Sequence, residues 1–197
     1  MIYSHSRIRR FLKCPLAYRF EYLDKIEIEE FDTIEAFMGS RVHEALEYLY
    51  TEALAGRSIS LGGLSAYYEE TWRDKLHSGV LINASGVSGA DYRIMGAKCL
   101  TDYYARYSPF DHAETIATEL KITVDLLGDG RYRFIGFIDR LDKDKQGRYE
   151  IHDYKTCKSA PSLKIKEHGQ QLALYELGVR QNRKDAKEVV LVCHYLR

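Results

Sequence analysis

The chain has 197 residues, and its 29 lysines and arginines balance its 29 aspartates and glutamates, so the formal net charge is +0. A content of 45% hydrophobic and 29% charged residues excludes disordered, collagen-like and coiled-coil chains and is typical of a globular protein with one apolar core. A neutral chain does not coat nucleic acid through bulk positive charge, so any contact with phosphate requires a local cluster.

Membrane and disulfide-rich classes are also excluded by the sequence. No apolar run approaches the ~20 residues of a membrane helix, and the N-terminus has no apolar signal segment. The cysteines are scattered without a C-x-x-C pair, which argues against a disulfide framework or a self-contained zinc site; they are Cys14, Cys99, Cys157 and Cys193. The sequence therefore predicts a cytoplasmic protein with reduced thiols and no membrane partner.

The first half of the chain is typical of helices. Helices are expected at residues 7–13, 16–23, 35–55, 64–76 and 93–107. Ser4 and Ser6 are candidate N-caps of the first, and the Cys14-Pro15 step separates it from the second. The last two helices flank a Gly/Ser-rich stretch, residues 78–89, which is expected to be a loop.

The second half is typical of a sheet. Strands are expected at residues 115–127, 131–141, 149–156 and 189–196, the last fully buried, and a helix at 165–180. Turns at residues 128–130 and 144–147 join the first three strands into hairpins. The predicted organisation is a single α/β domain with N-terminal helices (1–55), a helical insertion (56–112) and a core sheet and helix (113–197).

Three charged residues meet where two predicted strands pair. If the second hairpin loop spans residues 144–148, Asp139 lies opposite Asp153 with Cβ atoms about 5 Å apart, and Lys155 shares the face of Asp153. Two such carboxylates repel unless a cation such as Mg²⁺ or Mn²⁺ lies between them. That cation would polarise a phosphodiester and activate water. The alternative is a surface salt-bridge cluster, which the apolar neighbours of these residues disfavour.

Four motifs follow one another in the chain. They are Gly39-Ser40-Arg41-Val42-His43 (G-x-x-x-H), Gly136-Phe137-Ile138-Asp139 (G-x-x-D), Asp153-Tyr154-Lys155 (D-x-K) and Gln171-Leu172-Ala173-Leu174-Tyr175 (Q-L-x-x-Y). With Tyr3-Ser4-His5-Ser6 and Cys14-Pro15 near the start, the sequence resembles the PD-(D/E)xK nuclease superfamily, specifically the RecB-type exonuclease domains that include CRISPR-associated RecB-like nucleases. The resemblance implies a restriction-endonuclease-like core, a mixed central sheet flanked by helices in the order α-β-β-β-α-β, with a helical insertion.

The resemblance also implies residue roles. The implied metal ligands are His43, Asp139, Asp153 and the Tyr154 backbone carbonyl. Lys155 would be the catalytic lysine beside Asp139 and Asp153, while Gln171 and Tyr175 would line the site and help seat DNA, and Glu119 matches a family glutamate with a supporting role. Without the resemblance, a lone His43 on a helix is more often a core residue, and the pair on the later helix could be ordinary packing.

Cys14 raises the question of an iron–sulfur cluster. Many members of the family bind one through the cysteine of the Cys-Pro step and three C-terminal cysteines. No such trio follows here, and Cys193 falls inside the last strand, where it is expected to be buried. We therefore expect no cluster in this chain; Cys14 would be a ligand if one exists.

Basic and aromatic residues are candidates for DNA contacts. The basic residues are Arg7, Arg9, Arg10 and Lys13 on the first helix, and Lys155, Lys158, Lys164 and Lys166 after the site. They could hold phosphates or simply form a solvated face. Aromatic residues that could stack on single-stranded bases are Tyr67, Tyr68, Trp72, Tyr103, Tyr104 and Tyr107. Packing between helices is the favoured interpretation of these aromatic residues.

The sequence thus predicts a metal-dependent deoxyribonuclease. The resemblance implies that it is an exonuclease that hydrolyses single-stranded DNA or duplex ends and leaves 5′-phosphates. The resemblance implies a role in DNA repair, recombination or a CRISPR-type process, with a helicase or repair protein as partner. Two alternatives stay open: a non-catalytic DNA-binding module in a larger assembly, and a metal-dependent phosphatase acting on nucleotides.

Overall fold

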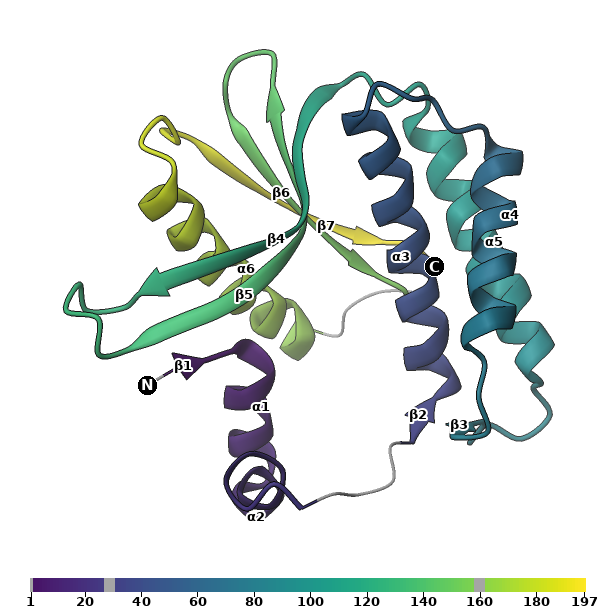
Figure 1. Cartoon of the computed structure of the whole chain (residues 1–197), viewed down its shortest axis with the longest axis horizontal. Coiled ribbons are helices and arrows are strands. Elements are labelled where there is room, and N and C mark those ends of the chain that lie inside the picture. The colour runs from purple at the N-terminus through teal and green to yellow at the C-terminus, as the bar shows by residue number, and fades with distance from the viewer. Residues whose placement is uncertain (1, 27–30, 158–161) are drawn as a thin grey trace.

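The computed structural model describes residues 2–26, 31–157 and 162–197, apart from the side chains of residues 162–167. A mixed five-stranded sheet lies between helices on its two sides (Figure 1). Among the described helices, none is long and apolar enough to cross a membrane.

The helices occupy nearly the predicted segments. They are α1 (His5–Lys13), α2 (Pro15–Tyr18), the π-helical turn η1 (Arg19–Leu23), α3 (Ile34–Leu54), α4 (Leu61–Lys75), α5 (Gly89–Tyr107) and α6 (Ser162–Asn182). Ser4 is the N-cap of α1, since its hydroxyl accepts a hydrogen bond from the backbone N–H of Arg7 at 3.3 Å. The second short helix begins at Pro15, as a proline at the first helical position allows, and continues into η1.

The predicted three-stranded meander and the predicted final strand are confirmed. The strands β4 (Ala113–Asp125), β5 (Arg133–Asp144) and β6 (Tyr149–Lys155) are antiparallel, and β7 (Val189–Tyr195) runs parallel to β6. Three short strands were not predicted. β1 (Ile2–Tyr3) pairs with β5, while β2 (Asp32–Thr33) pairs with β3 (Val80–Leu81), which lies inside the expected loop.

The two edges of β5 differ. β4 pairs along one edge, whereas the other edge carries β1 at residues 133–134 and β6 at residues 140–143. In the described part of the chain, no strand pairs with residues 135–139 on that second edge. β5 and β6 diverge from this point, as Figure 1 shows, and we call the place where they separate the fork. Because β5 and β6 no longer pair here, side chains of both strands can face the space between them.

Helices cover the sheet through two apolar clusters. On one side, α3 packs against α4 and α5 around Val42, Leu46 and Leu64, which are fully buried, and Tyr154 of β6 joins this cluster. On the other side, α6 packs on the strands through residues such as Leu172 and Val179. The sheet therefore lies between two helical layers, and the fork lies between the same two layers.

The last strand corrects the prediction that residues 189–196 are fully buried. β7 is the outer strand of the sheet path, and Leu191 and Tyr195 are each 37% exposed. Cys193 on this strand is half-buried rather than a core residue. An apolar run predicts a strand covered on both sides, but here only part of the strand is covered.

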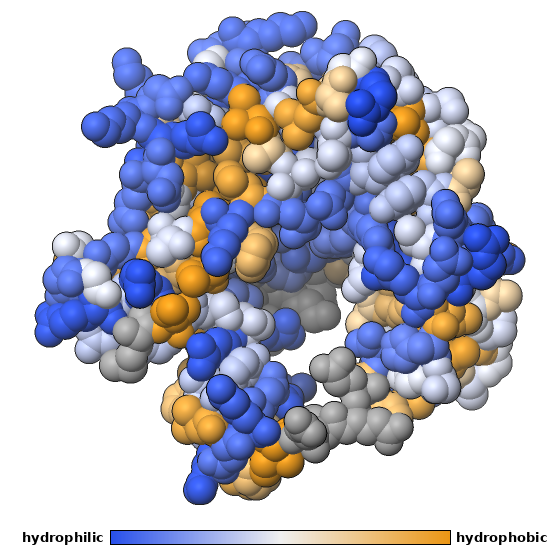
Figure 2. All heavy atoms as spheres, in the orientation of Figure 1, coloured by the Kyte–Doolittle hydropathy of each residue, from blue (hydrophilic) through white to orange (hydrophobic). Residues whose placement is uncertain are grey.

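The N-terminal helices present apolar side chains to the surface. Phe11 is 50%, Leu12 76% and Leu16 57% exposed. Figure 2 shows apolar atoms gathered over this lower part of the molecule. Within the described residues, no element covers this side of α1 and α2.

Candidate active site

The fork brings Asp139 and Asp153 together as the hairpin register predicts. Arg140 pairs with His152, so the same register continued by one residue sets Asp139 opposite Asp153. The backbone N–H of Tyr154 donates to Asp139 Oδ2 at 2.8 Å, which holds this carboxylate against β6. The predicted loop over residues 144–148 is confirmed, because Asp144 N–H donates to the Arg148 carbonyl at 2.9 Å.

Lys155 lies on the same side of β6 as Asp153, as strand alternation predicts. Its Nζ is 2.7 Å from both oxygens of the Asp153 carboxylate. The Asp153 side chain is only 4% exposed, while that of Lys155 is 22% exposed. The ammonium group of Lys155 thus neutralises the buried carboxylate of Asp153 and reaches toward solvent at the mouth of the fork.

α3 supplies His43 from the other side. His43 Nδ1 is 3.5 Å from Asp139 Oδ2, and its ring packs edge-on against Tyr154 at 5.9 Å between ring centroids. One turn earlier, a Cβ on Gly39 would lie 3.1 Å from Thr156 Oγ1, just beyond the end of β6. The glycine of the G-x-x-x-H motif therefore lets α3 approach the strand end closely enough for His43 to reach Asp139.

The backbone carbonyl of Tyr154 points toward the fork, as its implied role as a metal ligand requires. In a strand, the N–H and C=O groups of one residue project toward the same neighbour. Because the Tyr154 N–H points at Asp139, its carbonyl oxygen also faces the space between β5 and β6. The four implied ligand groups thus converge on one end of the fork.

Glu119 enters the site from β4. Its neighbours Thr118 and Leu120 pair with Arg140 and Ile138, so Glu119 lies across from Asp139. Its φ of 44° is in the left-handed region, which costs a residue other than glycine of order 1–3 kcal/mol. Burial, the charge of Asp139 and then that of Glu47 raise the pKa of Glu119 to about 7.

A cleft of about 530 Å³ opens beside these groups, between α3, the C-terminal end of α4 and β4. Four glutamates and two basic side chains line it; they are Glu35, Glu44, Glu47, Glu119, Arg41 and Lys75. Both basic side chains pair with Glu44, which leaves the cleft with excess negative charge. Such a cleft repels a phosphate unless cations enter it.

The electrostatics of Asp139 fit a cation site. Burial raises the pKa of this carboxyl and the charge of Asp153 adds to the rise, while His43 and the Tyr154 N–H oppose it. Oxygen donors with one imidazole suit Mg²⁺ or Mn²⁺, and a cation between the carboxylates would relieve their repulsion. The residues at the fork therefore fit a divalent metal.

α6 places Gln171 and Tyr175 beside the fork. Gln171 Nε2 donates to the Tyr175 hydroxyl at 2.8 Å, so the two share a face as predicted. Burial raises the pKa of Tyr175, and the carboxylates of Asp153 and Asp139 are near enough to add to that rise. A Cβ on Gly136 would lie 2.4 Å from Tyr175 Cε1, so the glycine of the G-x-x-D motif makes room for this ring.

Most of the basic and aromatic residues considered for DNA contacts interact with other residues of this chain. Arg10 pairs with Glu21 at 2.8 Å, and Arg7 lies over the ring of Tyr22 at 4.8 Å. Packing is the correct interpretation of Tyr68, Trp72 and Tyr103, which are 0%, 6% and 3% exposed. Lys158 and the side chains of Lys164 and Lys166 lie outside the described residues.

Cys14 has a local role in the structure. Its Sγ accepts a hydrogen bond from the Ala17 N–H at 3.4 Å and so caps α2. Cys193 lies instead beside the fork, with Sγ 3.8 Å from Asp153 Oδ2. An iron–sulfur role for Cys14 stays a prediction.

One group of polar residues was missed by sequence reasoning. Arg140, Asp142 and His152 are each at most 5% exposed and lie within the sheet. Arg140 and His152 stand one residue, and Asp142 three residues, from Asp139 or Asp153 on the same strands. Strand alternation therefore sets all three on the opposite face of the sheet, which was the signal that the sequence offered.

A family model of the PD-(D/E)XK nuclease superfamily matches residues 2–197. The chain therefore belongs to this superfamily, and the mixed sheet flanked by helices agrees with its restriction-endonuclease-like fold. Membership indicates a metal-dependent nuclease. A search of curated proteins finds no significant match.

Proposed function

We propose that the protein is a metal-dependent deoxyribonuclease of the RecB type that digests single-stranded DNA or duplex ends. The observation that carries the proposal is the convergence of Asp139, Asp153 and Lys155 at the fork, with His43 at 3.5 Å from Asp139. The preference for DNA and for ends comes from the four motifs that resemble RecB-type exonuclease domains.

The residues at the fork have distinct tasks. His43, Asp139, Asp153 and the Tyr154 carbonyl would hold Mg²⁺ or Mn²⁺. When bound, the ion supplies a polarised phosphodiester and a water of lowered pKa. The Lys155 ammonium lies against Asp153 and faces outward, where it would stabilise the negative charge that develops on phosphorus.

The bond changes follow from hydrolysis. The water oxygen attacks phosphorus and the bond to the 3′ oxygen breaks, so the products are a 5′-phosphate and a 3′-hydroxyl. Gln171 and Tyr175 border the site from α6, where an amide and a phenol can seat a sugar or phosphate. Glu119 faces Asp139 and would support the ion from β4.

The test uses end-labelled oligonucleotides, single- and double-stranded, with Mg²⁺ or Mn²⁺. We expect metal-dependent shortening from one end by the wild-type protein and none by Lys155→Ala. Lys145→Ala, in the exposed tip of the same hairpin, is the matched control and should digest DNA like the wild type. A closed circular single strand should survive, because an exonuclease needs an end.

Each other outcome selects an alternative. Cutting of the circle would replace the exonuclease by an endonuclease, and cleavage by Lys155→Ala would remove the fork from the reaction. Metal-independent DNA binding without cleavage would favour a binding module. Release of phosphate from a small phosphoester alone would favour a phosphatase. Partners such as a helicase, and a role in repair or a CRISPR-type process, stay predictions.

A further inference from the structure

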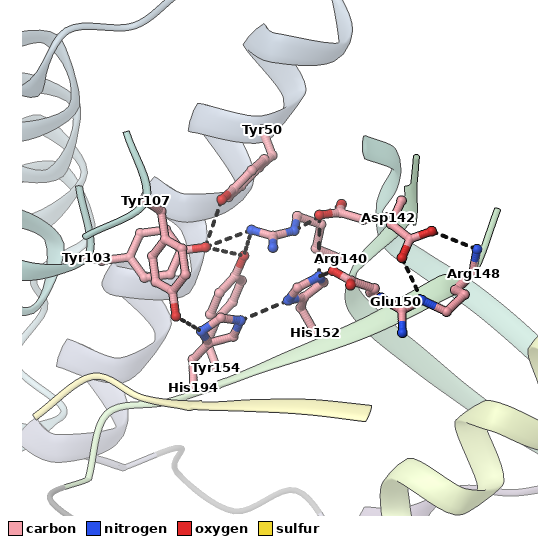
Figure 3. A network of polar contacts seen from close by, with 11 residues as sticks. Tyr50, Tyr103, Tyr107, Arg140, Asp142, Arg148, Glu150, His152, Tyr154 and His194 are labelled. Atoms are coloured by element: carbon pink, nitrogen blue, oxygen red, sulfur yellow. Dashed lines mark hydrogen bonds and ion pairs between the residues drawn. The ribbon is translucent and has the colours of Figure 1, made fainter. Parts of the chain in front are cut away.

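A second group of possible metal ligands lies on the same hairpin, away from the fork. Asp142 of β5 pairs directly with Glu150 of β6, and His152 is two residues further along β6 on the same side. Their ligand atoms all lie within 4.8 Å of one another. Figure 3 shows the three side chains pointing toward a common point beside Arg140. Two carboxylates directly across a strand pair repel each other, so this arrangement needs compensation.

The histidine is buried and lacks a hydrogen-bond partner on one nitrogen. His152 is 5% exposed, and its Nε2 forms no hydrogen bond with any described residue. This nitrogen lies 3.3 Å from Asp142 Oδ2 and 3.4 Å from Glu150 Oε2. A buried polar atom without a hydrogen bond is costly, so its direction toward two carboxylates calls for an explanation.

The distances fit a tetrahedral ion. Nitrogen and oxygen ligands of zinc bind at about 2.0–2.2 Å, so two of them at a tetrahedral angle lie roughly 3.4 Å apart. The two separations from His152 Nε2, 3.3 Å and 3.4 Å, have that length. Imidazole with carboxylates is a ligand set that zinc and related divalent ions accept.

Arg140 does not remove the need for a cation. Its Nε lies 3.0 Å from Asp142 Oδ1, on the side of the carboxylate away from His152, yet neither atom makes a hydrogen bond. Its Nη1 donates instead to the hydroxyls of Tyr103 and Tyr154, both at 2.7 Å. Arg140 therefore approaches only one oxygen of Asp142, and Asp142 Oδ2 and Glu150 stay available as ligands.

The other nitrogen of His152 is oriented as in many metal-bound histidines. Its Nδ1 lies 2.8 Å from His194 Nε2, and His194 Nδ1 lies 3.2 Å from the Tyr107 hydroxyl. A neutral His194 that donates to Tyr107 can accept from His152 Nδ1, which leaves the lone pair on Nε2 free for a ligand.

There is also room for an ion beside these groups. A cavity of about 80 Å³ is lined by Asp142, Glu150 and His152 together with Tyr50, Tyr107 and His112. His112 is exposed, so the cavity borders the surface at the start of β4. An ion could enter there and complete its shell with water.

We propose that Asp142, Glu150 and His152 bind a divalent transition-metal ion of the zinc type, at a site separate from the fork. The ion fastens β5 to β6 shortly before the strands diverge, with His152 one residue and the Asp142–Glu150 pair three residues from the fork. It thereby fixes the register that places Asp139 opposite Asp153, and its role is structural. The inference does not depend on the nature of the nucleic-acid substrate.

The test is zinc binding by the full chain, measured by competition with a chromophoric chelator, with Co²⁺ absorption as a report on ligand geometry. Glu150 is the ligand to change first, because it is partly exposed and its loss is the least harmful to folding. We expect Glu150→Gln to weaken zinc binding at least about tenfold and to weaken the Co²⁺ bands. Glu114→Gln, an exposed glutamate on β4, is the matched control and should bind like the wild type.

A variant at the fork separates the two sites. Asp139→Asn should keep the zinc equivalent held by the hairpin, with circular dichroism showing that each variant is folded. Zinc that is lost in Asp139→Asn but kept in Glu150→Gln would overturn the proposal, because the ion would then belong to the fork. Absence of zinc binding by the wild-type chain would overturn it too.

Discussion

The β5–β6 hairpin carries two polar clusters built from neighbouring residues, and they have opposite characters. At the fork, Lys155 and His43 reach solvent with 22% and 31% of their side chains exposed. One residue away, the inner network of Arg140, Asp142, His152 and Tyr154 is at most 5% exposed. The difference arises because the strands separate at the fork but stay covered by α3 and α5 over the network.

The two clusters lie on opposite faces of the same two strands. Along β6, His152 and Tyr154 alternate with Asp153 and Lys155, so each strand serves both clusters. The inner network connects three elements, since Arg140 lies over the ring of Tyr50 at 3.8 Å and bonds Tyr103. The network therefore holds the hairpin in place. This fixes the positions of the fork residues beside the cleft.

The largest expected effect is on cleavage at the fork. Asp153→Asn removes the charge that pairs with Lys155 and the proposed ion, so cleavage should fall at least about 10²- to 10³-fold while the fold persists. The initial rate on a labelled oligonucleotide measures the loss. Asp102→Asn, on the surface of α5, is the control and should keep the wild-type rate. An Asp153→Asn protein that cuts within about tenfold of wild type would contradict a catalytic fork.

The next effect is on stability through the inner network. Arg140→Met removes two hydrogen bonds and leaves the buried Asp142 without its cation, which should destabilise the protein by about 3–5 kcal/mol. Urea unfolding measures the change. Arg133→Met, at the exposed start of β5, should stay within about 0.5 kcal/mol of wild type. Equal stabilities of the two variants would show that the network does not hold the hairpin.

A smaller effect is expected where Tyr175 passes the sheet. Gly136→Ala sets a Cβ 2.4 Å from the buried Tyr175 ring, and such overpacking should cost about 1–3 kcal/mol. Gly169→Ala is the matched control on α6, where a Cβ meets no atom within 4 Å and helix propensity favours alanine. Thermal unfolding of both variants should move in opposite directions, and a shared direction would argue against the close contact.

Much of the fork could be predicted because its geometry is local. The turn from Asp144 to Arg148 fixes the hairpin register, and the register alone sets Asp139 opposite Asp153. Strand alternation then places Lys155 beside Asp153. The positions of His43 and Tyr175 came from the family resemblance, since no local rule says which helix face meets the sheet.

The inner network and the sheet edges could not be predicted for a physical reason. His194 and Tyr107 reach His152 from distant parts of the chain, and such contacts depend on how the layers pack. The pairing of β1 with β5 is equally non-local. The apolar run of β7 is the same whether a strand is central or at the edge, so its exposure was predicted wrongly.

The last and smallest effect concerns pH at the fork. Glu119 has its pKa raised to about 7 from 4.5, chiefly by burial, and that of Asp139 is raised as well. A protonated carboxyl stabilises the metal-free fold; this contribution is complete below pH 4.5 and is lost as the pH rises through 7. Metal binding has the opposite slope, because the carboxyl must lose its proton first.

Mg²⁺ should therefore raise the melting temperature more at pH 8 than at pH 6, with the affinity about tenfold weaker at pH 6 from Glu119 alone. Glu119→Gln keeps the side-chain size and removes the titration. Without metal, this variant should be more stable than wild type at pH 8 and equally stable at acid pH, because only the ionised carboxylate destabilises the fold. A Mg²⁺-induced shift in melting temperature that is equal at both pH values in the wild type would show that Glu119 does not face the ion.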